Sequence, residues 1–178
     1  MSRYSSQTKI LAEGTIIVAL SVTLKDFLPP ILQLPQGGSV SVAGMLPLLW
    51  FSLRRGLRSG MEAGAVYGLV HMALGGYIVN PVQAILDYPL AFAALGLAGL
   101  FSRSSAIRSV LGVGIGIFGR FICHFVSGIV FFAIYAPEGM NAVLYSAIYN
   151  GGYLLVEFVI SAIIIFILAK RRLLEIYI

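Results

Sequence analysis

Polar side chains lie inside apolar runs that are long enough to cross a membrane: Asp87, Tyr88, Arg120, His124, Tyr145, Tyr149 and Asn150. Polar groups in hydrocarbon are costly unless they pair or line a cavity, so they indicate a functional site. Arg120 and His124 are four residues apart, which puts them on one face of a helix. A carboxylate, hydrogen-bonding edges and aromatic faces together suit a heteroaromatic or cationic ligand. We therefore predict a cavity that holds a small polar ligand.

The charged residues of these runs also allow structural interpretations. Arg120 could neutralise Asp87 or Glu157 as a buried ion pair. Glu157 could serve a proton relay, although a structural partner for Arg120 is the favoured hypothesis, since one carboxylate without a chain of neighbours is weak support for a relay. We expect His71 to satisfy a neighbouring carbonyl group, as lone histidines on apolar faces usually do.

Motifs for catalysis or metal binding are not found. The segment 114–119 matches the dinucleotide pattern G-x-G-x-x-G, but no predicted strand precedes it. Its glycines, with Gly112 and Gly116 four apart, would instead let another helix approach closely. Histidines occur only at positions 71 and 124, and H-E-x-x-H, G-x-S-x-G and P-loop patterns do not occur. We predict no catalytic residue, no metal, no cofactor and no enzymatic activity.

Composition indicates a membrane protein. Of the 178 residues, 59% are hydrophobic and 11% are charged, whereas a soluble domain has about 25% charged residues. The length allows about six spans of roughly 20 residues in a single domain, 1–178. The net charge is +5, but the basic residues lie in small clusters between apolar runs. We therefore expect a lipid bilayer and no nucleic acid as a partner.

Hydropathy predicts an all-α membrane protein with six transmembrane helices, at residues 10–28, 40–53, 57–74, 81–101, 107–134 and 142–169. Pro29 and Pro30 end the first helix, because proline does not continue a helix easily. The Pro/Gly-rich segment 34–39 should form a loop. Thr15, Ala19 and Thr23 form a small-residue ridge that packs either inside the protein or against a partner.

Basic residues predict the orientation, because lysine and arginine favour cytoplasmic loops. Ten of the 12 basic residues fall on one side of the predicted helices. They are Arg3, Lys9, Arg54, Arg55, Arg58, Arg103, Arg108, Lys170, Arg171 and Arg172. Both termini should be cytoplasmic, and the outer loops should include residues 28–39, 75–80 and 135–141.

Five motifs together resemble one known family. They are Leu53-Arg54-Arg55-Gly56-Leu57, the segment 83–92 (QAILDYPLAF), Gly99-Leu100-Phe101, His124-Phe125-Val126-Ser127-Gly128 and the segment 145–151 (YSAIYNG). Their order and spacing are similar to those of the thiamine-specific S component of energy-coupling factor (ECF) transporters, the ThiT or YuaJ family. The resemblance extends over residues 46–168, most of the chain.

The resemblance implies an S-component fold in a bacterial cell membrane. Such a protein binds thiamine from outside and performs no chemistry, while a membrane coupling subunit and two cytoplasmic ATPases drive uptake. The family's pocket maps onto Tyr77, Asp87, Tyr88, His124, Gly128, Phe132, Tyr145 and Asn150, with Arg120 alongside. The ridge that docks on the coupling subunit maps onto Thr15 and Ala19.

The sequence departs from the family pattern at several positions. Asp87 replaces a glutamate and Phe132 a tryptophan, Thr15 replaces the first alanine of the ridge, and a pocket tryptophan from the first outer loop has no counterpart, since Trp50 is the only tryptophan. An S component for another vitamin therefore stays open. A stand-alone proton-coupled transporter that uses Glu157 and Arg120 is a further alternative. A membrane enzyme is disfavoured, because no nucleophile and base pair appears.

Overall fold

The computed structural model describes residues 3–41, 43–101 and 105–173, and helices dominate this part of the chain. Six helical segments follow one another. They are α1 (Arg3–Val22) with the π-helical turn η1 (Thr23–Phe27); α2 (Leu46–Arg55); α3 (Leu57–Gly75); a composite helix of α4 (Pro81–Ile85), η3 (Leu86–Leu90), α5 (Ala91–Ala94) and η4 (Leu95–Leu100); α6 (Ala106–Phe131), followed by the short turn η5 (Ala133–Tyr135); and α7 (Ala142–Lys170).

Each predicted span contains a helix, which confirms the predicted fold class. The second span differs most, because its first residues form part of a small hairpin instead. Strand β1 (Leu32–Gln33) pairs antiparallel with β2 (Ser39–Val40) around the turn η2 (Pro35–Gly37). Gln36 and Gly37 both have positive φ there, a conformation that turns the chain sharply and ends helical hydrogen bonding.

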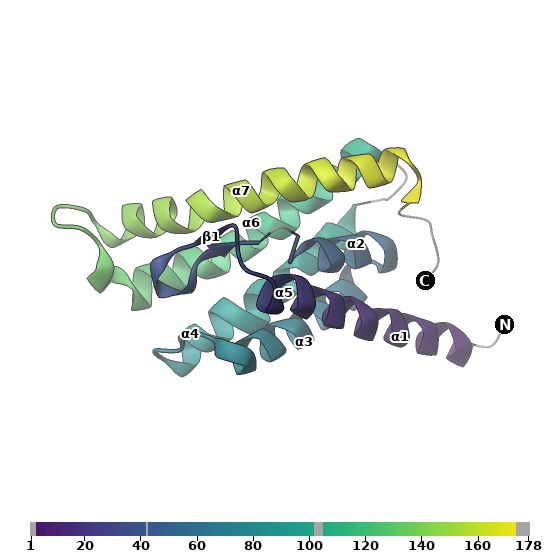
Figure 1. Ribbon diagram of the computed structural model, residues 1–178, viewed down its shortest axis with the longest axis horizontal. Helices are drawn as coiled ribbons and strands as arrows, with labels where there is room; N and C mark the ends of the chain where they lie inside the picture. The colour runs from purple at the N-terminus through teal and green to yellow at the C-terminus, as the bar shows by residue number, and fades with distance from the viewer. Residues whose placement is uncertain (1–2, 42, 102–104, 174–178) are drawn as a thin grey trace.

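The helices differ in whether their length and composition allow them to cross a membrane. Within the described residues, three are long and apolar enough to cross a membrane: Pro81–Leu100, Ala106–Phe131 and Ala142–Lys170. Helix α2 has 10 residues, and a straight span needs about 20. Helices α6 and α7 form a long antiparallel hairpin, and the first turn of α1 lies at the same end of the molecule as the last turn of α7 (Figure 1). The loops that join α3 to α4 and α6 to α7 lie at the opposite end (Figure 1).

Glycines bring the helices into backbone contact. A Cβ atom at Gly64 of α3 would overlap the carbonyl group of Phe92, and one at Gly68 would lie 2.5 Å from the carbonyl oxygen of Tyr88. On α6, a Cβ atom at Gly112 would lie 2.8 Å from the carbonyl oxygen of Ala98. At Gly116 the corresponding distance is 2.9 Å, to the carbonyl oxygen of Leu95. The prediction that Gly112 and Gly116 permit close approach of another helix is confirmed.

The composite helix is irregular where it carries polar residues. Pro89 has no N–H group and so cannot make the usual helical hydrogen bond. The chain widens into the π-helical turn η3 at this point, and η3 contains Asp87 and Tyr88. Single π-helical turns inside α-helices often occur at functional sites. Lys25 and Asp26 lie in the other π-helical turn, η1.

An ion cluster joins α1 to α2. The Glu13 carboxylate is buried, and Arg55 donates to both of its oxygens, from Nε at 2.6 Å and from Nη2 at 2.5 Å. Arg54 approaches Glu13 Oε1 at 3.3 Å through its own Nη2. These contacts fix the position of α1 beside the core residues of α2.

Gly64→Val should destabilise the protein by about 1–3 kcal/mol or more, because the added side chain must push α3 away from the carbonyl of Phe92. Thermal unfolding of the purified protein in detergent measures the effect. Gly152→Val is the matched control, since Gly152 is exposed and a Cβ atom there would meet nothing within 4 Å. Equal unfolding temperatures for the two variants would contradict the proposed close contact.

Candidate functional site

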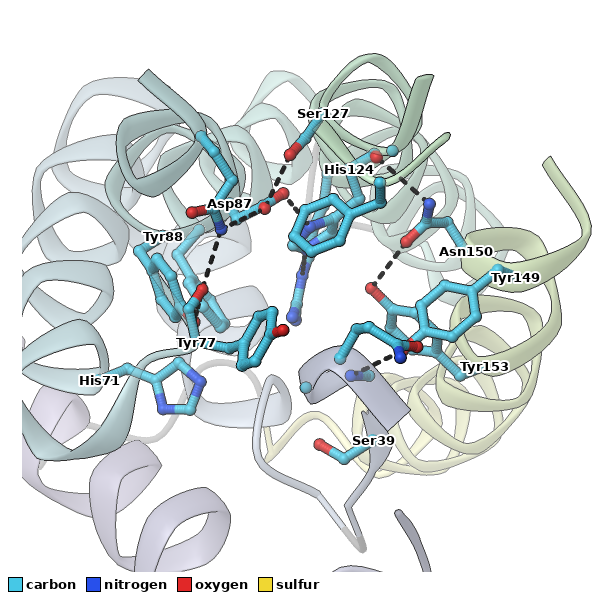
Figure 2. A pocket seen from close by; sticks show the side chains of 18 of the residues that line it. Ser39, His71, Tyr77, Asp87, Tyr88, His124, Ser127, Tyr149, Asn150 and Tyr153 are labelled. Atoms are coloured by element: carbon cyan, nitrogen blue, oxygen red, sulfur yellow. Dashed lines mark hydrogen bonds and ion pairs between the residues drawn. The ribbon is translucent and has the colours of Figure 1, made fainter. Parts of the chain in front are cut away.

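One cavity collects every residue of the predicted pocket. It has a volume of about 690 Å³ including its open mouth. Its wall includes Tyr77, Asp87, Tyr88, His124, Gly128, Phe132, Tyr145 and Asn150. Asp87, His124 and Asn150 face it from three different helices, and Ser39 approaches from strand β2 of the hairpin (Figure 2). The wall also contains Arg120 and residues outside the pocket that the resemblance implied: Lys25, residues 36–39, His71, Gln83, Phe92, Ser127, Tyr149 and Tyr153. Of these, Tyr149 was already among the polar residues that indicated a site.

Asp87 is held by donors from two helices. Gln83 Nε2 and Ser127 Oγ each donate to Oδ2 at 2.7 Å, and His124 Nδ1 lies 2.8 Å from Oδ1. The side chain of Asp87 is only 13% exposed. A buried carboxylate needs such hydrogen bonds, because desolvation disfavours a charge that is not compensated. The network fixes the carboxylate on the cavity wall.

Arg120 contacts His124 instead of a carboxylate. Its Nε donates to His124 Nε2 at 3.1 Å, and its Nη1 lies 2.6 Å from the sulfur of Met45. The guanidinium carbon lies 4.1 Å from the centre of the Phe92 ring. No ion pair among the described residues includes Arg120, so the predicted pairing with Asp87 or Glu157 is wrong. That pairing was suggested by opposite charge alone. Charge does not show which face of each helix points toward the other, so it could not identify the partner.

Glu157 pairs with Lys25 beneath the cavity. Lys25 Nζ lies 3.8 Å from Glu157 Oε1, and the same oxygen accepts from the backbone N–H and hydroxyl of Ser41, at 2.7 Å and 2.9 Å. Lys25 also donates to Ser39 Oγ at 2.7 Å. The cluster joins η1, the segment after β2 and α7, so Glu157 has a structural partner, but Lys25 takes the place that was predicted for Arg120.

His71 also differs from its expected role. Its Nδ1 contacts Asp26 Oδ1, a carboxylate instead of the predicted carbonyl, and Tyr67 donates to Asp26 Oδ2 at 3.3 Å. The imidazole stacks on the Tyr67 ring with centroids 5.7 Å apart and forms part of the cavity wall. Asp26 thereby connects η1 to α3 directly behind the site.

Tyrosines at four-residue spacing line the α7 side. The rings of Tyr145 and Tyr149 have centroids 5.8 Å apart, and those of Tyr149 and Tyr153 are 6.0 Å apart. The Tyr149 hydroxyl accepts from the N–H of Gly38 at 3.0 Å and donates to the carbonyl oxygen of Pro35. The hairpin loop therefore rests on α7 through one phenol group, beside the cavity (Figure 2).

Asn150 and Gly128 join α6 to α7. Asn150 Nδ2 lies 3.2 Å from the carbonyl oxygen of His124, and Tyr153 donates to Asn150 Oδ1 at 3.4 Å. A Cβ atom at Gly128 would overlap the hydroxyl of Ser146. These two residues of the predicted pocket thus hold the hairpin together as well as line the cavity.

The mouth of the cavity is aromatic. The rings of Tyr77 and Phe132 have centroids 6.1 Å apart, and the hydroxyls of Tyr77 and Tyr135 lie 3.1 Å apart. This hydrogen bond raises the pKa of Tyr77 above its ordinary value. Gln83 Nε2 and the Tyr88 hydroxyl donate to the carbonyl oxygen of Tyr77, at 3.0 Å and 3.3 Å. The loop after α3 is therefore tied to the same residues that surround Asp87.

Helical spacing would have identified some of the missed residues. Gln83 lies four positions before Asp87, and Ser127 lies three positions after His124, so each pair shares a helix face. Lys25 and His71 lie on other elements, and no spacing relates them to the site. Among the described residues, no group of three or more His, Cys, Asp or Glu side chains is arranged to hold a metal ion.

Comparison with known proteins identifies the family. The model of the family described as thiamine transporter protein (Thia_YuaJ) matches residues 11–176. This chain belongs to that family. Thiamine transporter ThiT of Bacillus subtilis strain 168 is 38% identical over 177 residues, which cover 92% of each chain. ThiT of Lacticaseibacillus paracasei is 34% identical over 182 residues, covering 91% of this chain and 87% of that protein.

A solved structure of ThiT from Listeria monocytogenes superposes with a TM-score of 0.84 at 33% identity, covering 93% of this chain and 96% of that chain. This likeness confirms the predicted fold, and the membership confirms the resemblance found in the sequence. Both of these relatives are named thiamine transporters, and transporters of this kind are not enzymes. Together with the three long apolar helices, the membership makes this chain a multi-pass membrane protein.

Lys25→Met should reduce the free energy of unfolding by about 3–5 kcal/mol, because it leaves the buried Glu157 carboxylate without a cation. The double variant Lys25→Met/Glu157→Gln should recover most of that loss. Thermal or chemical unfolding in detergent measures both.

Glu62→Gln is the control, since the Arg58–Glu62 pair has side chains that are 92% and 63% exposed, and exposed pairs contribute about 0–1 kcal/mol. The assignment of Lys25 as the partner of Glu157 fails if Lys25→Met is as stable as Glu62→Gln.

Proposed function

We propose that this protein is the S component of an ECF transporter and that it captures thiamine from outside the cell. The observation that carries the proposal is the position of Asp87, an acidic side chain on the wall of an open cavity that aromatic rings surround, in a member of the thiamine transporter family. Thiamine has a thiazolium cation, an aminopyrimidine ring and a hydroxyethyl arm. Each of these groups has a complementary group on the wall.

The carboxylate retains binding capacity for a ligand. An ionised carboxylate has about four acceptor positions. Gln83, Ser127 and His124 occupy three of them, which leaves one position and the negative charge. Charge-assisted hydrogen bonds are stronger than neutral ones. Asp87 therefore suits the thiazolium ring or the exocyclic amine of the pyrimidine.

Aromatic rings on two sides of the cavity suit flat heterocycles. Phe132 and Tyr77 lie at the mouth, and Tyr145, Tyr149 and Tyr153 lie on α7. A cation over an aromatic face gains about 0.5–2 kcal/mol.

Both termini are cytoplasmic in this proposal, and the cavity opens outward. The clusters of basic residues beside the helix ends support this orientation. So does the position of the loops around the cavity, at the end opposite the first turn of α1 and the last turn of α7 (Figure 1).

Partner subunits supply the energy in this proposal: a membrane coupling subunit and two cytoplasmic ATPases. Thr15 and Ala19 form the docking ridge for the coupling subunit, because both are exposed on α1, and Thr23 at the start of η1 is exposed as well. The hydroxyls of Thr15 and Thr23 donate to the carbonyl oxygens of Leu11 and Ala19, each at 3.0 Å. With their hydroxyls bonded to their own helix, these residues present a small, apolar surface of the kind that membrane helices use for close packing.

Asp87→Asn should weaken thiamine binding about tenfold or more, because it removes a charge-assisted interaction of about 1.5–3 kcal/mol while it preserves the side-chain shape. Isothermal titration calorimetry on the purified protein measures the affinity. Glu138→Gln is the matched control, since Glu138 is exposed and does not line the cavity. An unchanged affinity in Asp87→Asn would remove this carboxylate from the site.

Ala19→Leu should reduce thiamine uptake by the assembled transporter, because a bulky side chain holds α1 away from the coupling subunit. Thiamine affinity of the isolated chain should not change, since the cavity lies elsewhere. Ala73→Leu, an equal change at an exposed position of α3, is the control.

Uptake in cells and co-purification with the coupling subunit measure docking. Wild-type uptake by Ala19→Leu would exclude the ridge. Accumulation of thiamine against a gradient by the isolated chain in liposomes would exclude the S-component mechanism altogether.

A further inference from the structure

We propose that Arg120 is a positioning residue that holds His124 in the neutral tautomer with its proton on Nδ1, and that this tautomer directs Asp87. The inference concerns the same cavity and rests on the proposed function for its effect on thiamine. The hydrogen-bond order itself requires no ligand. It follows from the direction of two contacts on opposite edges of one imidazole ring.

The first contact determines the tautomer. An arginine side chain only donates hydrogen bonds, and its Nε lies 3.1 Å from His124 Nε2. Nε2 must therefore carry a lone pair. A neutral imidazole has one N–H group, so the proton is on Nδ1, which lies 2.8 Å from Asp87 Oδ1. An imidazolium has no lone pair for Arg120 and would put two cations in contact.

The surroundings of Arg120 explain why it points at the imidazole. Arg120 is 6% exposed, and no ion pair of the described residues includes it. Phe92 lies under the guanidinium carbon at 4.1 Å, and the sulfur of Met45 contacts Nη1 at 2.6 Å. Phe92 and Met45 are themselves buried. These two neighbours hold the guanidinium plane so that the Nε–H group is directed at His124.

The consequence is a chain of donors that ends on the acidic group: Arg120 donates to His124, and His124 donates to Asp87. With the opposite tautomer, Nδ1 would be an acceptor facing the oxygen of Asp87, and the carboxylate would lose one of its three donors. A neutral imidazole also presents an uncharged ring to a cationic ligand. The His124 ring is further held by the Tyr153 ring, with centroids 6.3 Å apart.

Two variants separate the donor of Arg120 from its charge. In Arg120→Gln, the amide nitrogen is the same number of bonds from Cα as the arginine Nε, so the donor stays and the charge is lost. In Arg120→Met, both are lost. Loss of the charge alone should favour a cationic ligand. If the donor matters, Arg120→Gln should bind thiamine within about threefold of wild type, and Arg120→Met should bind about tenfold more weakly, the loss of one buried hydrogen bond.

The spectroscopic test is direct, because the chain has only 2 histidines. Two-bond ¹H–¹⁵N correlation spectra of the ¹⁵N-histidine-labelled protein in detergent distinguish the two tautomers and the imidazolium. His71→Gln assigns the signals. Wild type and Arg120→Gln should carry the only ring proton of His124 on Nδ1. Arg120→Met should populate the imidazolium, because Asp87 still accepts from Nδ1 while Nε2 no longer has a donor and is free to take up a second proton. Arg108→Met, an exposed position of the same helix, should change nothing.

The inference is overturned if wild-type His124 carries its proton on Nε2 or is an imidazolium. It is also overturned if Arg120→Gln and Arg120→Met bind thiamine equally, since a role through charge or packing alone would then suffice. If the wild type does not bind thiamine at all, the proposed function fails, and the spectra still decide the tautomer.

Discussion

A negative charge inside a membrane protein needs donors, and the arrangement around Asp87 meets that need. Burying an isolated carboxylate would cost several kcal/mol or more. Gln83 comes from the same composite helix, and Ser127 and His124 come from α6. The carboxylate therefore fixes how these two helices are rotated against each other. The remaining parts of the site, including Arg120 behind His124, depend on that rotation.

Backbone geometry makes this arrangement possible. The π-helical turn η3 contains Asp87, Tyr88 and Pro89 and interrupts the regular hydrogen bonding of the composite helix at the site. Gly64 and Gly68 of α3 bring that helix into direct contact from one side, and Gly112 and Gly116 of α6 do so from the other. Larger residues at these positions would move η3 away from α6. The donors of α6 would then be too far from the carboxylate.

The sequence predicted the helices well because apolar runs and proline breaks report directly on span boundaries. The cavity residues were predicted through a resemblance to a known family, because hydrophobic periodicity alone does not show how two packed helices are rotated relative to each other. Pairings across helices were predicted poorly: Glu157 binds Lys25, and His71 binds Asp26. Both partners lie in the π-helical turn η1, whose register departs from the ideal helix and so could not be inferred from regular spacing.

Charge balance suggests how a cationic ligand lies in the cavity. Lys25 is compensated by Glu157, so Asp87 and Arg120 are the two charges that decide the field along the cavity. They are formally equal and opposite, but they are separated by the neutral ring of His124. Coulomb interactions are stronger where water is excluded. A thiazolium ring is therefore favoured beside Asp87 and disfavoured beside Arg120, which leaves the uncharged groups of thiamine to occupy the arginine side of the cavity.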